Sequence, residues 1–363
     1  MTAPLRVLVT ADVVGKELTG VGVATRMIVD ALRERPEVEV SVLVAGDSQA
    51  RQWGVPVVEA DWRVPGMPFV FTKHRKLKAF DVIHCSTVRV PFRGRPRGPV
   101  LVMTIHDLVP LVAPEYHTLG HRLYFRYLLA RSLRKFDAVV TDSEATRNDL
   151  VQRLGVESSK INVIPLYSRW KIEPRERTRT EDFVLAVGTI EPRKNVGRVA
   201  QAFVKVRERN PDLRHRLVIA GAAGWGESQP FEVPQPLRGE IEWRGYVSDE
   251  ELCSLYRDAA VLIYPSLLEG FGLPPLEAMS LGCPVITSDR SSLPEIGGDA
   301  VIYVDPTDVE NLTGAIERML CDGRLREELR QKGLERSRQF SPERMGEELS
   351  AVYRGVLGAG SDE

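Results

Sequence analysis

Short runs of apolar and β-branched residues alternate along this chain with longer stretches in which apolar positions recur at helical spacing. In the first half, the apolar runs read LRVLVT, VEVSVLVA, DVIHCS, VLVMTIHD, DAVVTDS and INVIPL. Helices are predicted from near Gly22 and from Ser143, since both stretches close with Arg or Gly, as helix ends tend to. Buried strands that alternate with helices predict a parallel sheet with helices on its faces.

The same pattern restarts after a polar and basic stretch, YSRWKIEPRERTRTED, at residues 167–182. The later apolar runs read FVLAVG, RLVIAG, IEWRGY, AVLIYPS, PVITSD and AVIYVD, and residues 306–357 have helical character. The sequence therefore predicts an α/β protein with two Rossmann-like domains, each with its ligand edge at the carboxyl ends of parallel strands. The predicted divisions are a first domain at 1–170, a linker at 171–182, a second domain at 183–340, a C-terminal helix at 341–357 that packs back toward the first domain, and a disordered tail at 358–363.

The composition narrows the class of protein. At 363 residues the chain is too long to fold around a single hydrophobic core of ordinary size. Its length suits two domains with a cleft between them. Its 49 Lys and Arg nearly balance 50 Asp and Glu, so no net field draws it onto nucleic acid. The four cysteines form no C-x-x-C pair, which favours reduced, buried thiols. Because the apolar run before Asp12 is too short for a signal peptide or a membrane span, a soluble cytoplasmic protein is expected.

Several nucleotide-binding signatures are absent from the sequence. No G-x-G-x-x-G follows a predicted strand, and Gly20-Val21-Gly22 lacks the third glycine, which argues against a two-domain dehydrogenase. The sequence has no P-loop lysine signature and no D-x-D pair of the kind that metal-dependent nucleotide-sugar enzymes use. We therefore expect a cleft that holds a phosphorylated ligand without a metal or another cofactor.

The stretch LLEGFGLPPLEAM, residues 267–279, places two carboxylates around a turn. Glu269 follows a buried strand, and Glu277 falls in the first turns of a helix that the Pro-Pro pair begins. Gly270 and Gly272 let the backbone approach a ligand closely, and N–H groups at a helix start attract anions. Carboxylates beside an anion site suit a nucleoside diphosphate sugar, whose hydroxyls need acceptors while its diphosphate needs amides and cations.

The segment EGFGLPPLEAMSLGCPVITSDRSSLPEIGGDAVIYVDPTDVENL resembles the donor-site signature of the retaining GT-B glycosyltransferases of family 4, the glycosyl transferases group 1, with its E-x7-E motif intact. VLAVGTIEPRKNVGRVAQAF and EWRGYVSDEELCSLYRDAAVLIYPS are similar to other signatures of that family's second domain. TIHDLVPLVAPE and VTDSEATRNDL are similar to signatures of its first domain. The resemblance covers nearly the whole chain, is weaker between Asp47 and Ala79, and implies a GT-B fold with two domains facing a cleft.

The resemblance also implies roles for individual residues. Glu277 would hold the ribose hydroxyls of the donor, and Glu269 would lie beside the transferred sugar and the diphosphate. Arg193 and Lys194 match a cationic pair that neutralises the departing diphosphate, and fixed cations there lower the barrier. His106 matches a histidine near the donor sugar. The other implied contacts are Gly20, Gly22, Thr189, Tyr246, Val247, Gly270, Phe271, Gly272 and Leu273 for the donor, and Asp107 for the acceptor.

The implied reaction is transfer of a hexose from a nucleotide sugar to an acceptor hydroxyl, with retention, in polysaccharide, glycolipid or glycoconjugate synthesis. The motifs TIHDLVPL and VGTIEPRKN favour GDP-mannose as the donor, with a UDP-sugar as the alternative. Thr189 stands where many relatives have arginine, which leaves the donor nucleotide open. The alternatives are an epimerase or phosphorylase on the same fold and a nucleotide-sugar-binding protein without turnover.

Two segments of the predicted first domain combine cations with leucines and aromatic residues: KHRKLKAF at 73–80 and HRLYFRYLLARSLRKF at 121–136. The cations of the first segment are Lys73, Arg75, Lys76 and Lys78. In a nearly neutral chain these segments predict peripheral contact with an anionic membrane surface, or contact with a lipid-linked acceptor. A solvated helix face is the alternative interpretation of both segments.

Overall fold

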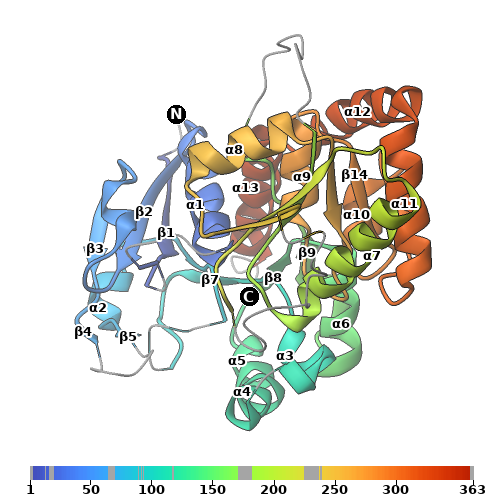
Figure 1. Ribbon diagram of the computed structural model, residues 1–363. Helices are drawn as coiled ribbons and strands as arrows, with labels where there is room; N and C mark the ends of the chain where they lie inside the picture. The colour runs from blue at the N-terminus through green and yellow to red at the C-terminus, as the bar shows by residue number, and fades with distance from the viewer. Residues whose placement is uncertain are drawn as a thin grey trace. The chain divides into compact units, whose positions relative to one another are not determined.

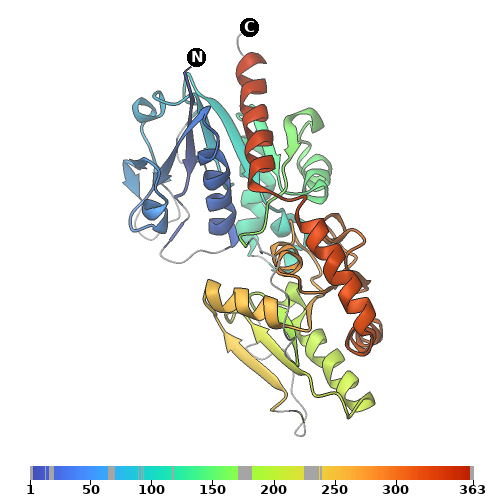
Figure 2. The ribbon, with the colours of Figure 1, turned by 90° about the horizontal axis from the view of Figure 1, so that it is seen from above.

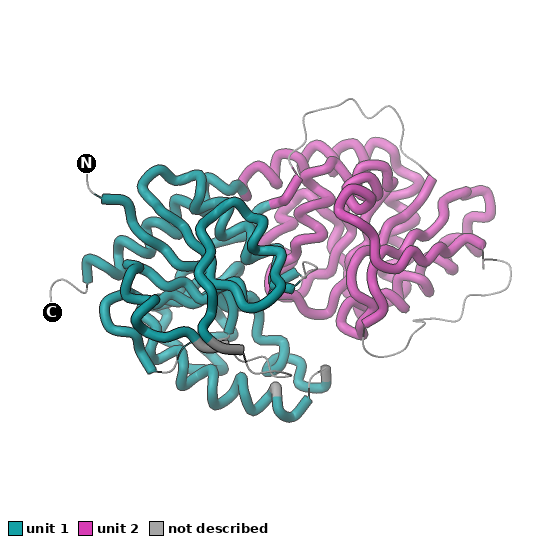
Figure 3. The backbone as a smooth tube through the Cα atoms, turned by 90° about the vertical axis from the view of Figure 1, so that its left-hand side faces the viewer, with its two compact units in different colours: residues 1–167, 341–363 teal, residues 168–340 magenta. Residues whose placement is uncertain are grey.

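A computed structural model of the chain describes residues 3–12, 14–15, 20–63, 70–88, 90, 92, 94–116, 118–170, 182–224, 237 and 239–359 (Figure 1). The chain forms two compact units, residues 1–167 with 341–363 and residues 168–340 (Figure 3). The division falls between Tyr167 and Ser168 rather than after residue 170. Residues 171–181 of the predicted linker and 360–363 of the predicted tail lie outside the described residues.

The first unit is built on a parallel sheet. Its described strands are β1 (Leu5–Thr10), β2 (Val38–Val44), β3 (Val57–Glu59), β6 (Val82–Cys85), β7 (Val100–Ile105), β8 (Ala138–Thr141) and β9 (Ile161–Val163), with the pair β4 (Trp62–Arg63) and β5 (Val70–Phe71) forming a separate antiparallel ribbon. The sheet order is β3-β2-β1-β6-β7-β8-β9. Every apolar run predicted in this half therefore contains a strand, and β3 was not predicted.

Helices cover this sheet and connect its strands. They are α1 (Gly20–Arg33), α2 (His74–Leu77), α3 (Val109–Val112), α4 (Leu119–Leu123), a π-helix η3 (Tyr124–Leu129), α5 (Ala130–Leu133), α6 (Glu144–Leu154) and α13 (Pro342–Ala359), with 3-10 turns η1 (Gln49–Gln52), η2 (Pro114–Tyr116) and η4 (Ser158–Lys160). α6 begins and ends as its sequence predicts, because Ser143 caps its first turn and Gly155 leaves it with a left-handed φ of 64°. α1 begins at Gly20, earlier than predicted.

The C-terminal helix α13 belongs to the first unit and packs on α1, beside which it runs in Figure 2. A Cβ on Gly346 would lie 2.6 Å from the carbonyl oxygen of Ala31, so only glycine permits this close approach. The hydroxyl of Tyr353 lies 2.6 Å from Nδ1 of His84, whose Nε2 is 2.7 Å from the hydroxyl of Thr104. Burial lowers the pKa of His84 to about 3, so this link is made by a neutral imidazole.

The second unit has its own parallel sheet, with order β12-β11-β10-β13-β14-β15 among the described strands. The strands are β10 (Phe183–Val187), β11 (Arg216–Ala220), β12 (Ile241–Gly245), β13 (Val261–Tyr264), β14 (Val285–Ser288) and β15 (Ile302–Val304). The helices are α7 (Val196–Arg209), α8 (Asp249–Asp258), α9 (Leu273–Ser280), α10 (Leu293–Gly297), α11 (Val309–Cys321) and α12 (Gly323–Ser337), with the 3-10 turn η5 (Pro192–Lys194). Fully buried Phe203 of α7 and Met319 of α11 belong to one core with the sheet.

Candidate active site

The strand order of the second unit determines which loops meet. β10 pairs with β11 on one side and with β13 on the other, so connections leave this point in opposite directions. In open parallel sheets, ligands bind at the carboxyl ends of the strands at such a switch point. Arg193 and Lys194 lie in η5 shortly after β10, and Glu269 lies in the loop after β13. Residues about 75 positions apart in the sequence thus reach the same edge of the sheet.

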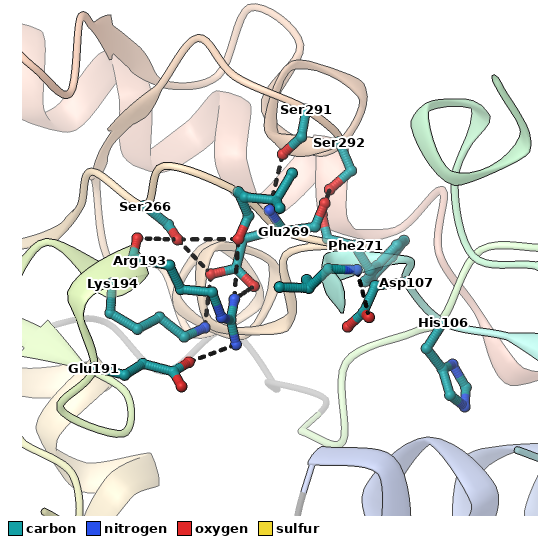
Figure 4. A network of polar contacts seen from close by, with 12 residues as sticks. His106, Asp107, Glu191, Arg193, Lys194, Ser266, Glu269, Phe271, Ser291 and Ser292 are labelled. Atoms are coloured by element: carbon teal, nitrogen blue, oxygen red, sulfur yellow. Dashed lines mark hydrogen bonds and ion pairs between the residues drawn. The ribbon is translucent and has the colours of Figure 1, made fainter. Parts of the chain in front are cut away.

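Glu269 is the centre of a buried polar network (Figure 4). Its Oε2 accepts a hydrogen bond from Nη1 of Arg193 at 2.8 Å. Its Oε1 accepts hydrogen bonds from Nζ of Lys194 at 2.6 Å, the hydroxyl of Tyr264 at 2.8 Å and the hydroxyl of Ser266 at 2.6 Å. Both carboxylate oxygens are therefore held by cations, in an environment that strengthens charge-assisted bonds.

The same contacts determine the ionisation of Glu269. Burial alone raises the pKa of a carboxyl group, but the charges of Lys194 and Arg193 and the hydrogen bonds to Oε1 outweigh it and lower the pKa of Glu269 to about 2. Glu191 adds a second carboxylate, with Oε1 2.7 Å from Nη2 of Arg193. Burial lowers the pKa of Lys194, and the charge of Glu269 opposes this shift.

The loop that carries Glu269 is fixed through its backbone. The N–H of Glu269 donates to the hydroxyl of Ser291 at 2.9 Å, and Ser292 donates to the carbonyls of Glu269 and Phe271 at 3.0 and 2.6 Å. Gly272 has a φ of 124°, and a Cβ there would lie 2.9 Å from the side chain of Leu293. The loop therefore requires glycine at this position.

Glu277 lies on α9 and contacts a different cation. Only 3% of its surface is exposed. Its Oε1 accepts from Nε of Arg169 at 2.9 Å, and its Oε2 accepts from the hydroxyl of Tyr256 at 3.3 Å. Burial raises the pKa of Glu277, and the charge of Arg169 offsets this only in part. The two glutamates of the 267–279 stretch thus occupy separate ion-pair networks.

In the first unit, His106 and Asp142 form a buried pair after β7 and β8. Nδ1 of His106 is 2.6 Å from Oδ2 of Asp142, and Nε2 is 3.1 Å from the carbonyl oxygen of Ser86. A carbonyl only accepts, so Nε2 carries a proton, and one further proton is shared between Nδ1 and the carboxylate. Burial opposes the charged imidazole, but the charge of Asp142 and its hydrogen bond raise the pKa of His106. Burial also raises the pKa of Asp142, so the two side chains share one proton between Nδ1 and Oδ2.

Comparisons with known proteins show the family of this chain. The family described as "Glycosyltransferase Family 4" matches residues 18–166, and "Glycosyl transferases group 1" matches residues 168–336. The O-antigen chain mannosyltransferase B of Escherichia coli is 32% identical over 266 residues, which are 70% of each chain. The chain belongs to the family 4, group 1 glycosyltransferases.

A second relative and two solved structures of other proteins extend the comparison. The MMP alpha-(1->4)-mannosyltransferase of Mycolicibacterium hassiacum is 30% identical over 300 residues, covering 77% of this chain and 71% of that one. The structure of Anabaena Alr3699/HepE in complex with UDP and glucose superposes with a TM-score of 0.73 at 16% identity, over 97% of this chain and all of that one. Sucrose-phosphate synthase from Thermosynechococcus elongatus gives 0.71 at 18% identity, over 98% and 100%. The glycosyltransferase therefore has the GT-B fold.

Other residues that the resemblance assigned to the donor lie on loops of the second unit, at the start of α9 or on α1. Thr189 is exposed after β10, and Tyr246, 66% exposed, follows β12 beside the half-buried Val247. Gly270 belongs to the loop that carries Glu269, and Leu273 is the first residue of α9. Gly20 and Gly22, expected in a loop, lie in the first turn of α1.

Two of the predicted site residues have local structural contacts in this glycosyltransferase. The side chain of Phe271 is 5% exposed and packs edge-on against Phe340, with ring centroids 6.1 Å apart. Oδ1 of Asp107 accepts from the N–H of Val109 at 3.2 Å, in the turn that leads into α3. These contacts account for both side chains without a ligand.

Sequence reasoning missed three residues that complete the two networks and the histidine pair: Arg169, Glu191 and Asp142. The sequence does contain a sign of Asp142, because this residue directly follows the strand in DAVVTDS and so reaches the same sheet edge as His106. It contains none for Arg169, because this residue was assigned to the end of the first domain. Among the described residues, no three His, Cys, Asp or Glu side chains are grouped as a metal site requires.

Proposed function

We propose that this glycosyltransferase transfers a hexose onto an acceptor hydroxyl with retention of anomeric configuration. The first candidate is mannose, with GDP-mannose as the donor. The observation that carries the proposal is the ion-pair network of Arg193, Lys194 and Glu269 at the switch point of the second unit. The relatives at 32% and 30% identity are named mannosyltransferases, which supports mannose as the transferred sugar.

The network is suited to a leaving diphosphate. Each cation has donors beyond those it gives to Glu269, since an ammonium has three N–H groups and a guanidinium five. A nucleoside diphosphate gains negative charge as the glycosidic bond breaks, and fixed cations stabilise that charge without reorganisation. The acceptor oxygen bonds to the anomeric carbon on the face that the phosphate leaves, and the leaving phosphate oxygen takes the acceptor's proton, so the anomeric configuration is retained.

The donor is tested with nucleotide sugars and a panel of saccharide and polyprenyl-linked acceptors. GDP-mannose should raise the melting temperature of the chain and release GDP, because a ligand that binds only the folded state stabilises it. NMR of the product should show the anomeric configuration of the donor. Glu269→Gln is the matched inactive control. Absence of binding and turnover with GDP- and UDP-sugars would refute the proposal, while interconversion of the sugar without release would favour an epimerase.

We further propose that the chain reaches its acceptor at an anionic lipid surface. An exposed face in the first unit supports this. Four large apolar side chains stand out from α4 and η3: Leu119, Leu123, Tyr127 and Leu128, exposed by 68, 47, 59 and 57%. Residues 116–136 contain no Asp or Glu and carry the cations Arg122, Arg126, Arg131, Arg134 and Lys135. The opposite face packs into the core through fully buried Leu129 and nearly buried Leu133.

This face favours lipid binding more than the other basic segment does. In α2, Leu77 is fully buried, and Lys76 forms an ion pair with Asp61 at 3.0 Å. Beside the exposed apolar residues, α4 and η3 carry Arg122 and Arg126, and Arg131, Arg134 and Lys135 follow in and after α5. Each cation is worth about 1 kcal/mol near an anionic surface. No helix among the described residues is long and apolar enough to cross a bilayer.

The test is sedimentation of the chain with anionic and with neutral vesicles at low and high salt. Wild type should bind the anionic vesicles at low salt, and the double variant Leu123→Asp, Tyr127→Ser should not. Val151→Asp is the control, since Val151 is another exposed apolar residue of the same unit, on α6. Equal loss in the control, or binding that ignores lipid charge and salt, would refute the lipid surface.

A further inference from the structure

The first three residues of the second unit form a clasp on the helices α8 and α9. The hydroxyl of Ser168 is 2.7 Å from that of Ser280 at the end of α9. The ring of Trp170 meets Tyr256 of α8 edge-on, with centroids 5.8 Å apart. Between them, Arg169 reaches Glu277. The segment that was assigned to the first domain is therefore folded against the donor-side carboxylate.

Arg169 is held in one orientation from three directions. Its Nε donates to Oε1 of Glu277 at 2.9 Å, and its Nη1 donates to Oδ1 of Asp249 at 2.7 Å. Its guanidinium lies over the ring of Trp170, 4.4 Å from the centroid. Lysine cannot replace this planar, forked donor, because an ammonium group would not reproduce the two directed hydrogen bonds and the stacking on the ring. The side chain of Arg169 is 22% exposed, so solvent screens this pair only partly.

We propose that Arg169 is a positioning residue that keeps Glu277 ionised and aimed at the hydroxyls of the donor's ribose. The inference rests on the proposed function, which assigns the ribose to Glu277. An ionised carboxylate accepts two hydroxyl hydrogens at once, whereas a protonated one has an O–H that donates instead. Because burial of Glu277 favours the neutral acid, the cation beside it decides which form the ribose meets.

Loss of the cation should therefore make nucleotide binding sensitive to pH. In Arg169→Met, the pKa of Glu277 should move up, and the Kd for GDP should rise about tenfold for each pH unit below it. Wild type should bind GDP with little change between pH 6 and pH 8.5. Arg169→Lys keeps the charge but not the fork, so its Kd should rise at every pH without a new slope.

The experiment is calorimetric titration of the full chain with GDP, and with UDP as the second probe, across that pH range. Arg330→Met is the matched control, because Arg330 pairs with the exposed Glu327 on the same unit, within α12. A pH-independent loss in Arg169→Met equal to that in Arg169→Lys would show a merely structural role. An unchanged Kd in Arg169→Met would also overturn the inference.

A second measurement separates this inference from the proposed function. Carbon NMR of glutamate-labelled protein without ligand follows the Glu277 carboxyl, assigned by its absence in Glu277→Gln. A higher titration midpoint in Arg169→Met supports the positioning role, even if wild type binds no nucleoside diphosphate and the proposed function fails. An unchanged midpoint overturns the positioning role, even if nucleotides bind normally.

Discussion

Glu269→Gln should destabilise the second unit by an amount that depends on pH. The pKa of Glu269 falls from 4.5 in an unfolded chain to about 2 in the fold, a difference of about 2.5 pH units. At about 1.4 kcal/mol per unit, the ionised carboxylate contributes about 3 kcal/mol to the free energy of unfolding. Measured losses on breaking buried ion pairs are similar, at about 3–5 kcal/mol.

The sign of the pH dependence follows from the direction of the shift. A lowered pKa in the folded state means that the contribution is present above pH 4.5 and is lost as the pH falls toward about 2. The stability gap between wild type and Glu269→Gln should thus be about 3 kcal/mol at pH 7 and about 2 kcal/mol smaller at pH 3. Gln keeps the size of the side chain, so the change removes charge rather than volume.

Urea unfolding at pH 7, 5, 4 and 3 measures this gap, with hydrogen exchange on β13 peptides to assign the transition to the second unit. Glu327→Gln is the control, since Glu327 is 57% exposed in a surface pair and should change stability by less than about 1 kcal/mol. A gap that stays constant from pH 7 to pH 3 would show that Glu269 is not ionised through its contacts with Lys194 and Arg193.

Three further outcomes are expected. Lys194→Met should lower kcat by about 10²–10³ with a smaller change in donor Kd, and a kcat within twofold of wild type would remove Lys194 from the leaving-group site. Glu277→Ala should weaken GDP binding by about 1.5–3 kcal/mol, as calorimetry would show. Asp142→Asn should reduce the melting temperature more at pH 6 than at pH 9. Because the pKa of His106 is raised in the fold, its contribution to stability is complete below pH 6.5 and is lost as the pH rises through the pKa of the folded state. An equal reduction at both pH values would contradict a charged interaction between His106 and Asp142.

Local chemistry made much of the fold predictable. The run DAVVTDSEATRNDLVQRLG contains a buried strand, a serine cap and a closing glycine, and the structure has β8, Ser143 and Gly155 in those roles. The stretch after β13 likewise predicts a loop and a helix that begins beside the Pro-Pro pair, as α9 does. Strand periodicity and capping depend on neighbours in sequence, so they can be read from one chain.

Pairings between distant residues could not be predicted in this way. Asp142 lies 36 residues from His106, and Arg169 lies 108 residues from Glu277. Each contact depends on strand order or on how a connecting segment folds back, which no local pattern encodes. The π-helix at Tyr124–Leu129 was also missed, because its residues give no local signal that separates it from an ordinary helix.

The eight-residue spacing of the two glutamates gains a physical meaning from their partners. Glu269 is on the loop after β13 and contacts Arg193 and Lys194 of η5, which follows the neighbouring strand β10, so its charge is compensated before any ligand arrives. Glu277 lies just over one turn into α9 and is compensated from outside the sheet, by Arg169. A diphosphate adds negative charge where cations are already held, while a ribose adds none. In the proposed function, the cations at Glu269 therefore meet the charged part of the donor, whereas Arg169, by keeping Glu277 ionised, provides a hydrogen-bond acceptor for the ribose hydroxyls.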